Sequence, residues 1–457
     1  MRSSEPVVPE YADRFRCIGS ACEDTCCQGW SVPVDRAAWE KYQGLPESSL
    51  RTLIDSSILL ASEAPDGAKP VSFAVLRMDD ANRCLLLTED RLCRIHKEIG
   101  EGFLSHTCAT YPRIAHSIGG VRESALALSC PEAARLVLFG AELETCPVPE
   151  SSDPADAGPG PVQSPGDETL PQAWFWPIRA SVLALIRNRA YPLWQRMCLL
   201  DLFCRRLDSI FDAIRKGKLK RSVPEFLGDF RQAVGAGTLQ PAMEALPVDG
   251  AAQLDVVLRL AGMMLHRSNV TPRFVECVQA FTAGIGNSAG ATLKSLQASF
   301  DAAHDRYFAP FFERHPQVLE NYLINTVIRC QFPFGRDAMR TGEAPSEANC
   351  KAPSMTRECV MLTAQFVLIK GLLIGVAGRF REKFSAEHVV HTAQAASKHF
   401  EHHPEFLQLA YELLVESRMD GALGLAILTR NGVAATPAFF RAASPAAPAP
   451  PARAEPA

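Results

Sequence analysis

The sequence lacks several features that would indicate a function directly. Its formal net charge is only −4 over 457 residues, so no basic excess favours nucleic acid as a partner. The first residues, MRSSEPVVPEYADRF, contain no apolar run of the kind that forms a secretory signal peptide. The longest apolar stretch, FVLIKGLLIGVAG, is interrupted by Lys370 and is short for a bilayer span. We therefore expect a cytoplasmic protein with no membrane segment.

Cysteine, in contrast, is abundant and unevenly placed. The chain has 15 cysteines, and this odd number excludes a framework in which every cysteine is in a disulfide. In a reducing compartment, clustered thiols are more often metal ligands or catalytic groups than disulfides. The seven cysteines after residue 130 are scattered, and we expect most of them to be small core residues. Eight lie nearer the start of the chain: Cys17, Cys22, Cys26, Cys27, Cys84, Cys93, Cys108 and Cys130.

These eight thiols predict a metal site. Sulfur is a soft donor for zinc or iron, and one centre needs about four ligands. The group at 17–27 and the group at 84–130 are expected to converge on one ion or cluster. Adjacent Cys26 and Cys27 should point apart, so that one of them serves a second centre or packs inward. The spacing is neither that of a zinc ribbon nor the CxxxCxxC of radical S-adenosylmethionine enzymes, and both iron–sulfur and zinc fit sulfur ligation. Eight buried thiols without metal are the alternative.

Polar residues follow the second cysteine group. Arg94, His96 and His106 flank it, and Tyr111 and Arg113 come soon after Cys108. Hydrogen bonds and positive charge near thiolates stabilise their anionic form and tune a cluster. The alternative is that these residues are ordinary surface groups.

Composition divides the chain into parts. Residues 147–170 are rich in Pro, Gly, Ser and Asp, which predicts a flexible linker. We expect a mainly α protein with a small mixed α+β, cysteine-rich, metal-binding domain over residues 1–146. An all-α helical domain should follow over 171–435, where apolar residues recur at three-to-four spacing, and a disordered Pro/Ala tail over 436–457.

Within the first domain, short elements are expected. WSVPVD and VSFAVLRM are typical of strands, and Asp35 should cap a helix through RAAWEKYQ. The segment RIAHSIGGVRESALAL predicts a hairpin that turns at Gly119-Gly120, and RCLLLTEDRLCRIH predicts a second one.

Three segments resemble the hallmark segments of the flagellin lysine-N-methylase family: FRCIGSACEDTCCQGWSVPVD, CRIHKEIGEGFLSHTCATYPR and ALALSCPEAARL. The resemblance covers about residues 11–140. It implies a cytoplasmic enzyme that methylates surface lysines of flagellin, uses S-adenosylmethionine as methyl donor and carries an iron–sulfur cluster. The 4Fe-4S form is one option, zinc is the alternative metal, and the ligands would come from the eight cysteines.

The methyl-transfer chemistry itself is only partly visible in the residues. A conventional methyltransferase shows a strand, a glycine-rich loop and a helix, whereas TAGIGNSAG (282–290) follows a helical pattern and is treated as a loop. S-adenosylmethionine would then bind otherwise, for example through an open iron of the cluster. Arg94 and Arg113 are the candidates to bind it. Lysine must also lose a proton before it accepts a methyl group, and the candidate bases are Tyr111, His96 and the acid-and-amide helix LENYLINTVI.

A helical segment, LENYLINTVI (319–328), places Asn321 and Asn325 on one face. A solvated helix face is the favoured interpretation there. Two other functions remain open for the whole chain: a non-enzymatic zinc-stabilised protein-interaction module, and a cluster-based redox sensor.

Overall fold

The computed structural model describes residues 7–60, 73–118, 121–140, 143, 145–147, 169–218, 222–266, 270–335, 354–402 and 404–432. Within these ranges the protein is mainly α, which confirms the predicted fold class. The Gly119-Gly120 turn, linker residues 148–168 and the Pro/Ala tail lie outside the described residues.

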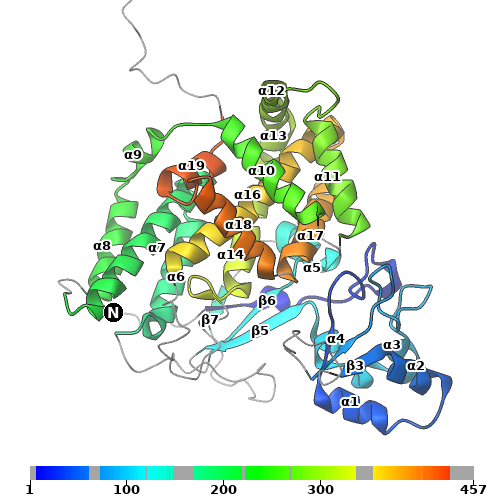
Figure 1. Ribbon diagram of the computed structural model, residues 1–457. Coiled ribbons are helices and arrows are strands. Elements are labelled where there is room, and N and C mark those ends of the chain that lie inside the picture. The colour runs from blue at the N-terminus through cyan, green and yellow to red at the C-terminus, as the bar shows by residue number, and fades with distance from the viewer. Residues whose placement is uncertain are drawn as a thin grey trace, which may run out of the picture.

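A small unit forms around residues 17–112 and lies beside a larger helical body (Figure 1). Strand β4 pairs antiparallel with both β2 and β3. The predicted cap is confirmed, because the Asp35 carboxylate accepts a hydrogen bond of 2.9 Å from the Ala38 N–H. The elements are β2 (Pro33–Val34), α1 (Arg36–Gln43), α2 (Ser49–Ser57), β3 (Ile58–Leu60), β4 (Ala74–Leu76), α3 (Arg94–Ile99), a 3₁₀ turn (Glu101–Phe103) and α4 (His106–Thr110).

The second predicted hairpin, over residues 83–96, is wrong. The segment forms turns, with single bridges that join Met78 to Cys84 and Leu87 to Cys93. Helix α3 then begins at Arg94. The apolar run Leu85–Leu87 was mistaken for a strand, although it belongs to a loop that carries one cysteine at each end.

The first predicted hairpin is confirmed, as β5 (Arg113–Ile118) paired with β6 (Val121–Leu126). It belongs to the helical body, because Ile118, Ala125 and Leu126 are buried in the same core as the helices. Strand β6 and helix α5 (Pro131–Phe139) both pack against α14 (Gln317–Arg329). The division between the two hydrophobic cores therefore falls near residue 112 and does not coincide with the predicted boundary at 146.

The helical body contains most of the chain after residue 170. A short sheet of β1 (Val7–Pro9) and β7 (Thr145–Pro147) lies next to β6. The described helices of the body, besides α5 and α14, are α6 (Phe175–Arg187), α7 (Leu193–Arg215), α8 (Val223–Gly235), α9 (Gln240–Glu244), α10 (Gly250–Leu265), α11 (Pro272–Gly284), α12 (Leu293–Ala303), α13 (Ala309–Arg314), α16 (Met355–Phe380), α17 (Ala386–Glu401), α18 (Pro404–Glu416) and α19 (Ala422–Thr429).

Helix α16 is the centre of this body and packs against α7, α10, α11, α17, α18 and α19 (Figure 1). Its glycines allow a close helix crossing: a Cβ atom at Gly375 would lie 2.8 Å from the Phe281 carbonyl oxygen of α11. By length and composition the longer helix that contains the stretch FVLIKGLLIGVAG and runs to Lys383 is sufficient to cross a membrane. Its apolar window is entirely buried among the other helices, as in a core helix.

Candidate functional site

Four cysteines meet at the core of the small unit, and we call them the core cysteines: Cys27, Cys84, Cys93 and Cys108. Cys84 is buried in this core and the other three pack against it. The Cys84 N–H donates to the Cys27 carbonyl at 2.8 Å, so two distant segments are tied at the sulfur-bearing residues. Burial raises the pKa of Cys108 to about 12, and Cys93 and Cys84 are among the neighbours that raise it further.

The other four, here called the junction cysteines, lie where the small unit meets the helical body: Cys17, Cys22, Cys26 and Cys130. Cys130 precedes α5, and burial raises its pKa to about 12, with Cys22 and Cys26 adding to the effect. Burial also raises the pKa of Cys22, to which Cys17 contributes.

The two groups of sulfur atoms are in contact through Cys26 and Cys27. A hydrogen bond from the Cys27 thiol holds the pKa of Cys26 below its usual value, and the same bond raises the pKa of Cys27. The expectation that these adjacent side chains point apart is therefore wrong. Cys26 thus links the core cysteines to Cys130, whereas Cys17 is exposed and lies near Cys22.

Backbone N–H groups point at several of these sulfur atoms. Burial is the larger effect and raises the pKa of Cys93, but the N–H groups of Ile95 and His96 act to lower it. Burial likewise raises the pKa of Cys84, to about 11, and the Leu86 N–H acts to lower it. Buried thiols surrounded by N–H donors lose their protons readily to a bound cation, since the donors stabilise the thiolate.

The donor set fits a sulfur-ligated metal in its chemistry: soft atoms, N–H donors to the sulfurs, and convergence from distant segments. Among the residues that the structure describes, however, no three histidine, cysteine, aspartate or glutamate side chains are arranged to hold a metal ion. The core cysteines are brought together in the small unit, and the convergence of both groups on one ion or cluster stays a prediction.

A buried ion pair fastens the segment that carries Cys22, Cys26 and Cys27 to helix α17. Lys398 Nζ donates to Asp24 Oδ2 at 2.8 Å and to the Thr25 carbonyl at 2.9 Å. Gln394 Nε2 donates to the same carboxylate at 2.7 Å and to the Ser129 carbonyl at 2.9 Å. Burial acts to raise the pKa of Asp24, but the Lys398 ammonium outweighs it and holds that pKa below its usual value.

An aromatic group lies at the same junction. The Trp30 ring stacks on His402 with centroids 4.3 Å apart and on Tyr111 at 5.8 Å. Trp30 Nε1 also donates to the Cys26 carbonyl at 2.8 Å. The Tyr111 hydroxyl lies 3.0 Å from Ser129 Oγ, which is 3.0 Å from His402 Nε2. Tyr111, predicted as a catalytic residue, is thus placed next to the junction cysteines, and burial raises its pKa well above the usual value.

The other predicted site residues lie elsewhere. His96 is exposed on α3. Arg113 Nη2 donates to the Phe15 carbonyl at 2.8 Å and its guanidinium lies over the Phe15 ring, so the structure shows it holding the segment that precedes Cys17. It is not brought together with Arg94.

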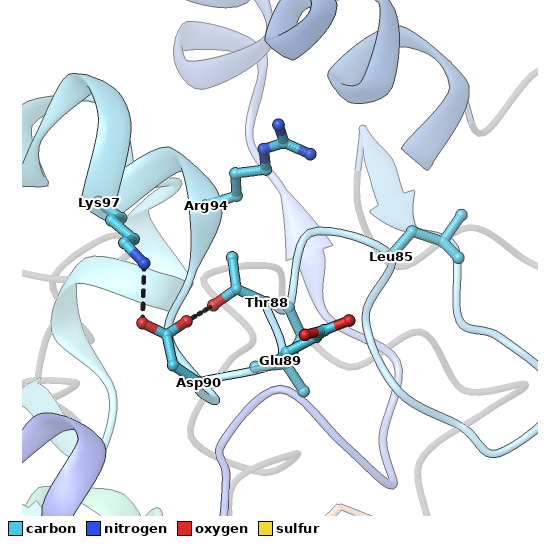
Figure 2. Close-up of a pocket in the computed structure, with 7 residues that line it drawn as sticks. Leu85, Thr88, Glu89, Asp90, Arg94 and Lys97 are labelled. Atoms are coloured by element: carbon cyan, nitrogen blue, oxygen red, sulfur yellow. Dashed lines mark hydrogen bonds and ion pairs between the residues drawn. The ribbon is translucent and has the colours of Figure 1, made fainter.

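Arg94 borders an open hollow of about 550 Å³ beside the Cys84–Cys93 loop, and Figure 2 shows its guanidinium over that hollow. Arg94 Nε pairs with Glu98 at 2.5 Å. On the same wall, Lys97 and Thr88 both bind Asp90, the former at 2.8 Å, and Glu89 completes a charged lining. The volume of this hollow falls in the range of small-molecule sites.

The interpretation of Asn321 and Asn325 as a solvated face is wrong, since both are buried. Asn325 Oδ1 accepts from the Tyr11 hydroxyl at 2.6 Å and from the Leu126 N–H at 3.1 Å, and its Nδ2 donates to the Leu126 carbonyl. Asn325 thus docks the β5–β6 hairpin on α14. The four-residue spacing showed that Asn321 and Asn325 share a face of the helix, but it could not show that the β5–β6 hairpin covers that face.

Sequence reasoning missed the residues of α17 that meet the cysteine segment: Gln394, Lys398 and His402. No spacing relates them to a segment about 370 positions earlier. Of the scattered cysteines whose burial the structure describes, Cys198, Cys204, Cys277 and Cys359 are buried core residues as expected, and Cys330 is half-buried.

Comparison with known proteins extends the resemblance to the helical body. Residues 179–428, more than half of the chain, match the family model described as the FliB lysine N-methylase C-terminal domain. The chain belongs to the FliB lysine N-methylase family. This confirms the assignment made from the cysteine-bearing segments, because the match covers the part of the chain that those segments do not.

Individual relatives agree over a shorter stretch. The lysine-N-methylases of Salmonella typhimurium and Salmonella choleraesuis are each 34% identical over 131 residues, which is 28% of this chain and 31% of those proteins. The flagellar biosynthetic protein FliU of Salmonella muenchen is 34% identical over 131 residues, or 75% of its length. The alignment thus spans about a third of the two lysine-N-methylases. No solved structure matches the chain.

Proposed function

We propose that this member of the FliB family transfers methyl groups from S-adenosylmethionine to lysine side chains of flagellin in the cytoplasm. Family membership and the names of its relatives, which refer to lysine methylation and to the flagellum, support this function. The observation that supports it most directly is that Cys26 and Cys130 lie near Tyr111 at the junction between small unit and helical body.

For the cofactor, we assign an iron–sulfur cluster to the junction cysteines and a structural metal, iron or zinc, to the core cysteines. Held by three of the four junction cysteines, such a cluster would leave one iron open to S-adenosylmethionine. The N–H groups that follow Cys130 and Cys93 act against the effect of burial and stabilise the two thiolates once a cation is bound.

Among the candidate bases, we assign Tyr111 as the residue that contacts the target lysine. Its ring lies at the junction, where Cys130 and Cys26 both affect its pKa after burial, whereas His96 is exposed on α3. We assign to Arg94 the binding of a small molecule that carries a carboxylate, in the hollow that Arg94 borders. A guanidinium binds a carboxylate through two parallel hydrogen bonds.

The test is methyl transfer with anaerobically purified protein, its metal content measured first. Incubation with flagellin and S-adenosylmethionine should add mass to flagellin in methyl steps, localised to lysines by peptide mass spectrometry. Unchanged flagellin with a fully loaded protein would reject the function, and stoichiometric zinc without iron would favour a zinc-braced interaction module.

Three single variants locate the metal. Cys22→Ser, in the junction group, should remove iron and activity, and Cys93→Ser, in the core group, should remove the structural metal. Cys277→Ser, a buried thiol of α11, is the matched control and should keep both. Full metal retention in Cys22→Ser or Cys93→Ser would remove that residue from the ligand set.

A further inference from the structure

Ser129 is held from two sides, which leaves its hydroxyl to bridge two rings. Its N–H donates to Glu401 Oε2 at 3.0 Å, and its carbonyl accepts from Gln394 Nε2 at 2.9 Å. Its Oγ lies 3.0 Å from both the Tyr111 hydroxyl and His402 Nε2. A single serine hydroxyl thus connects the proposed lysine-binding phenol to an imidazole.

The His402 imidazole, at one end of this hydrogen-bonded chain, is held in place but is accessible to solvent. His402 ends helix α17, and its ring stacks on Trp30 with centroids 4.3 Å apart. Both rings are half-buried, whereas Ser129 between the two ends is 2% exposed. A connected chain with a shielded middle and a solvent-accessible end is the arrangement that moves a proton away from a dry site.

We propose that Tyr111, Ser129 and His402 form a proton relay that removes one proton from the ε-ammonium of the target lysine, with His402 as the acceptor. The inference rests on the proposed function, since it concerns how the substrate lysine becomes a nucleophile. Tyr111 is the residue that touches the lysine, and His402 acts through Ser129.

The step balances as follows in atoms and charge. The ammonium gives a proton to the Tyr111 oxygen while Tyr111 passes its own to Ser129 Oγ and Ser129 passes its own to His402 Nε2. The neutral amine then forms an N–C bond with the methyl carbon of the sulfonium donor, and the C–S bond pair returns to sulfur. The products are a methylated ammonium and a neutral thioether, and the imidazolium releases its proton to water.

The charges around the relay are largely matched. Glu401 precedes His402 on α17, and its carboxylate pairs with Arg329 of α14 at 3.2 Å and accepts from the Leu128 N–H. Across the junction, Tyr111 is influenced by Cys130 and Cys26 as well as by Glu401. The relay therefore lies between an ion pair of the helical body and the junction cysteines.

The experiment measures single-turnover methyl transfer to a flagellin substrate, together with metal content and substrate affinity, in His402→Gln and Ser129→Ala. Both variants should lose about 10²- to 10⁴-fold in the transfer rate, the usual contribution of a general base, at unchanged metal content and affinity. The residual rate of His402→Gln should rise about tenfold for each pH unit, because only lysine that is already neutral reacts, up to the ordinary lysine pKa near ~10.4.

His391→Gln is the matched control, since this histidine lies on the same helix but its Nε2 meets the Arg273 carbonyl at 3.2 Å. It should transfer at the wild-type rate with the wild-type pH profile. If wild-type protein is active and His402→Gln keeps its rate and pH profile, the relay is overturned while the function stands. If loaded wild-type protein transfers nothing, the proposed function fails first.

Discussion

The small unit and the helical body are held together by different means. Among the described residues, the small unit buries only a dozen side chains in its core, one of them a cysteine, and its strands have two or three residues. The helical body buries a continuous apolar core around α16. A core as small as the first usually needs disulfides or a metal to be stable. From this comparison we expect a metal held by the cysteines to give the small unit the stability that buried apolar area gives the body.

Removal of the metal should have the largest effect of the changes considered, and it should affect the small unit but not the helical body. Treatment with a strong chelator under anaerobic, reducing conditions should unfold the small unit, because metal-binding free energy is folding free energy in such sites. Hydrogen exchange should then lose its protection over residues 27–108, while α10 and α16 keep theirs. Equal protection of the small unit before and after verified metal loss would show that its apolar core is sufficient.

The junction between the two regions depends on a buried ion pair, and two lysines allow its contribution to be isolated. Lys398 and Lys97 each pair with an aspartate at 2.8 Å, but the Lys398 side chain is 2% exposed and that of Lys97 is 51% exposed. Lys398→Met leaves the Asp24 charge buried and should cost about 3–5 kcal/mol in the free energy of unfolding. Lys97→Met should cost about 1 kcal/mol or less.

Urea denaturation of the two variants, monitored separately in the small unit and the body, measures both costs. Similar values for Lys398→Met and Lys97→Met would mean that the junction is not held by this pair. A further check is metal content, which should fall in Lys398→Met because Asp24 lies between Cys22 and Cys26.

Much of the helical body could be predicted from the sequence, and less of the small unit. Apolar spacing identified the helices and the hairpin at 113–128, because each is a local pattern. The segment 83–96 misled, since Leu85 is exposed and the segment forms only single bridges, at Cys84 and Leu87, instead of pairing in a sheet. The cysteine-bearing segments showed which residues converge. They could not show that α17 meets them, because Lys398 and His402 are recognisable only once the chain is folded.

The body contains its own buried charge, Lys370 of α16, which tests how dry the apolar core is. Burial lowers the pKa of Lys370 to about 7, and its Nζ donates to the Thr429 carbonyl at 2.6 Å; His304 is the titratable neighbour on which its charge acts. The unfolded lysine keeps its proton to about pH 10, so between pH 7 and 10 the unfolded state binds more protons and stability rises with pH.

The measurement compares wild type with Lys370→Met by denaturation at pH 7 and pH 9. Their difference in unfolding free energy should move by about 2 kcal/mol in favour of wild type over these two units, as one pKa unit corresponds to about 1.4 kcal/mol. A difference that stays constant with pH would show that Lys370 remains charged, and that the centre of the body is wetter than its burial indicates.

The smallest expected effect lies in the small unit and concerns how its short helices are joined. Asp35 Oδ1 caps α1 at the Ala38 N–H, and its Oδ2 accepts from the His106 N–H of α4 at 2.7 Å, so one carboxylate serves two helices. Ser48 caps only α2, at the Arg51 N–H.

In metal-loaded protein, Ser48→Ala should cost about 1 kcal/mol in the free energy of unfolding, and Asp35→Ala should cost up to about 2 kcal/mol. Burial acts to raise the pKa of Asp35, but the N–H groups of His106 and Ala38 hold it below its usual value, so the excess cost should be present above pH 4 and fade as pH falls further. Equal costs for the two caps would mean that α1 and α4 are joined by the metal alone.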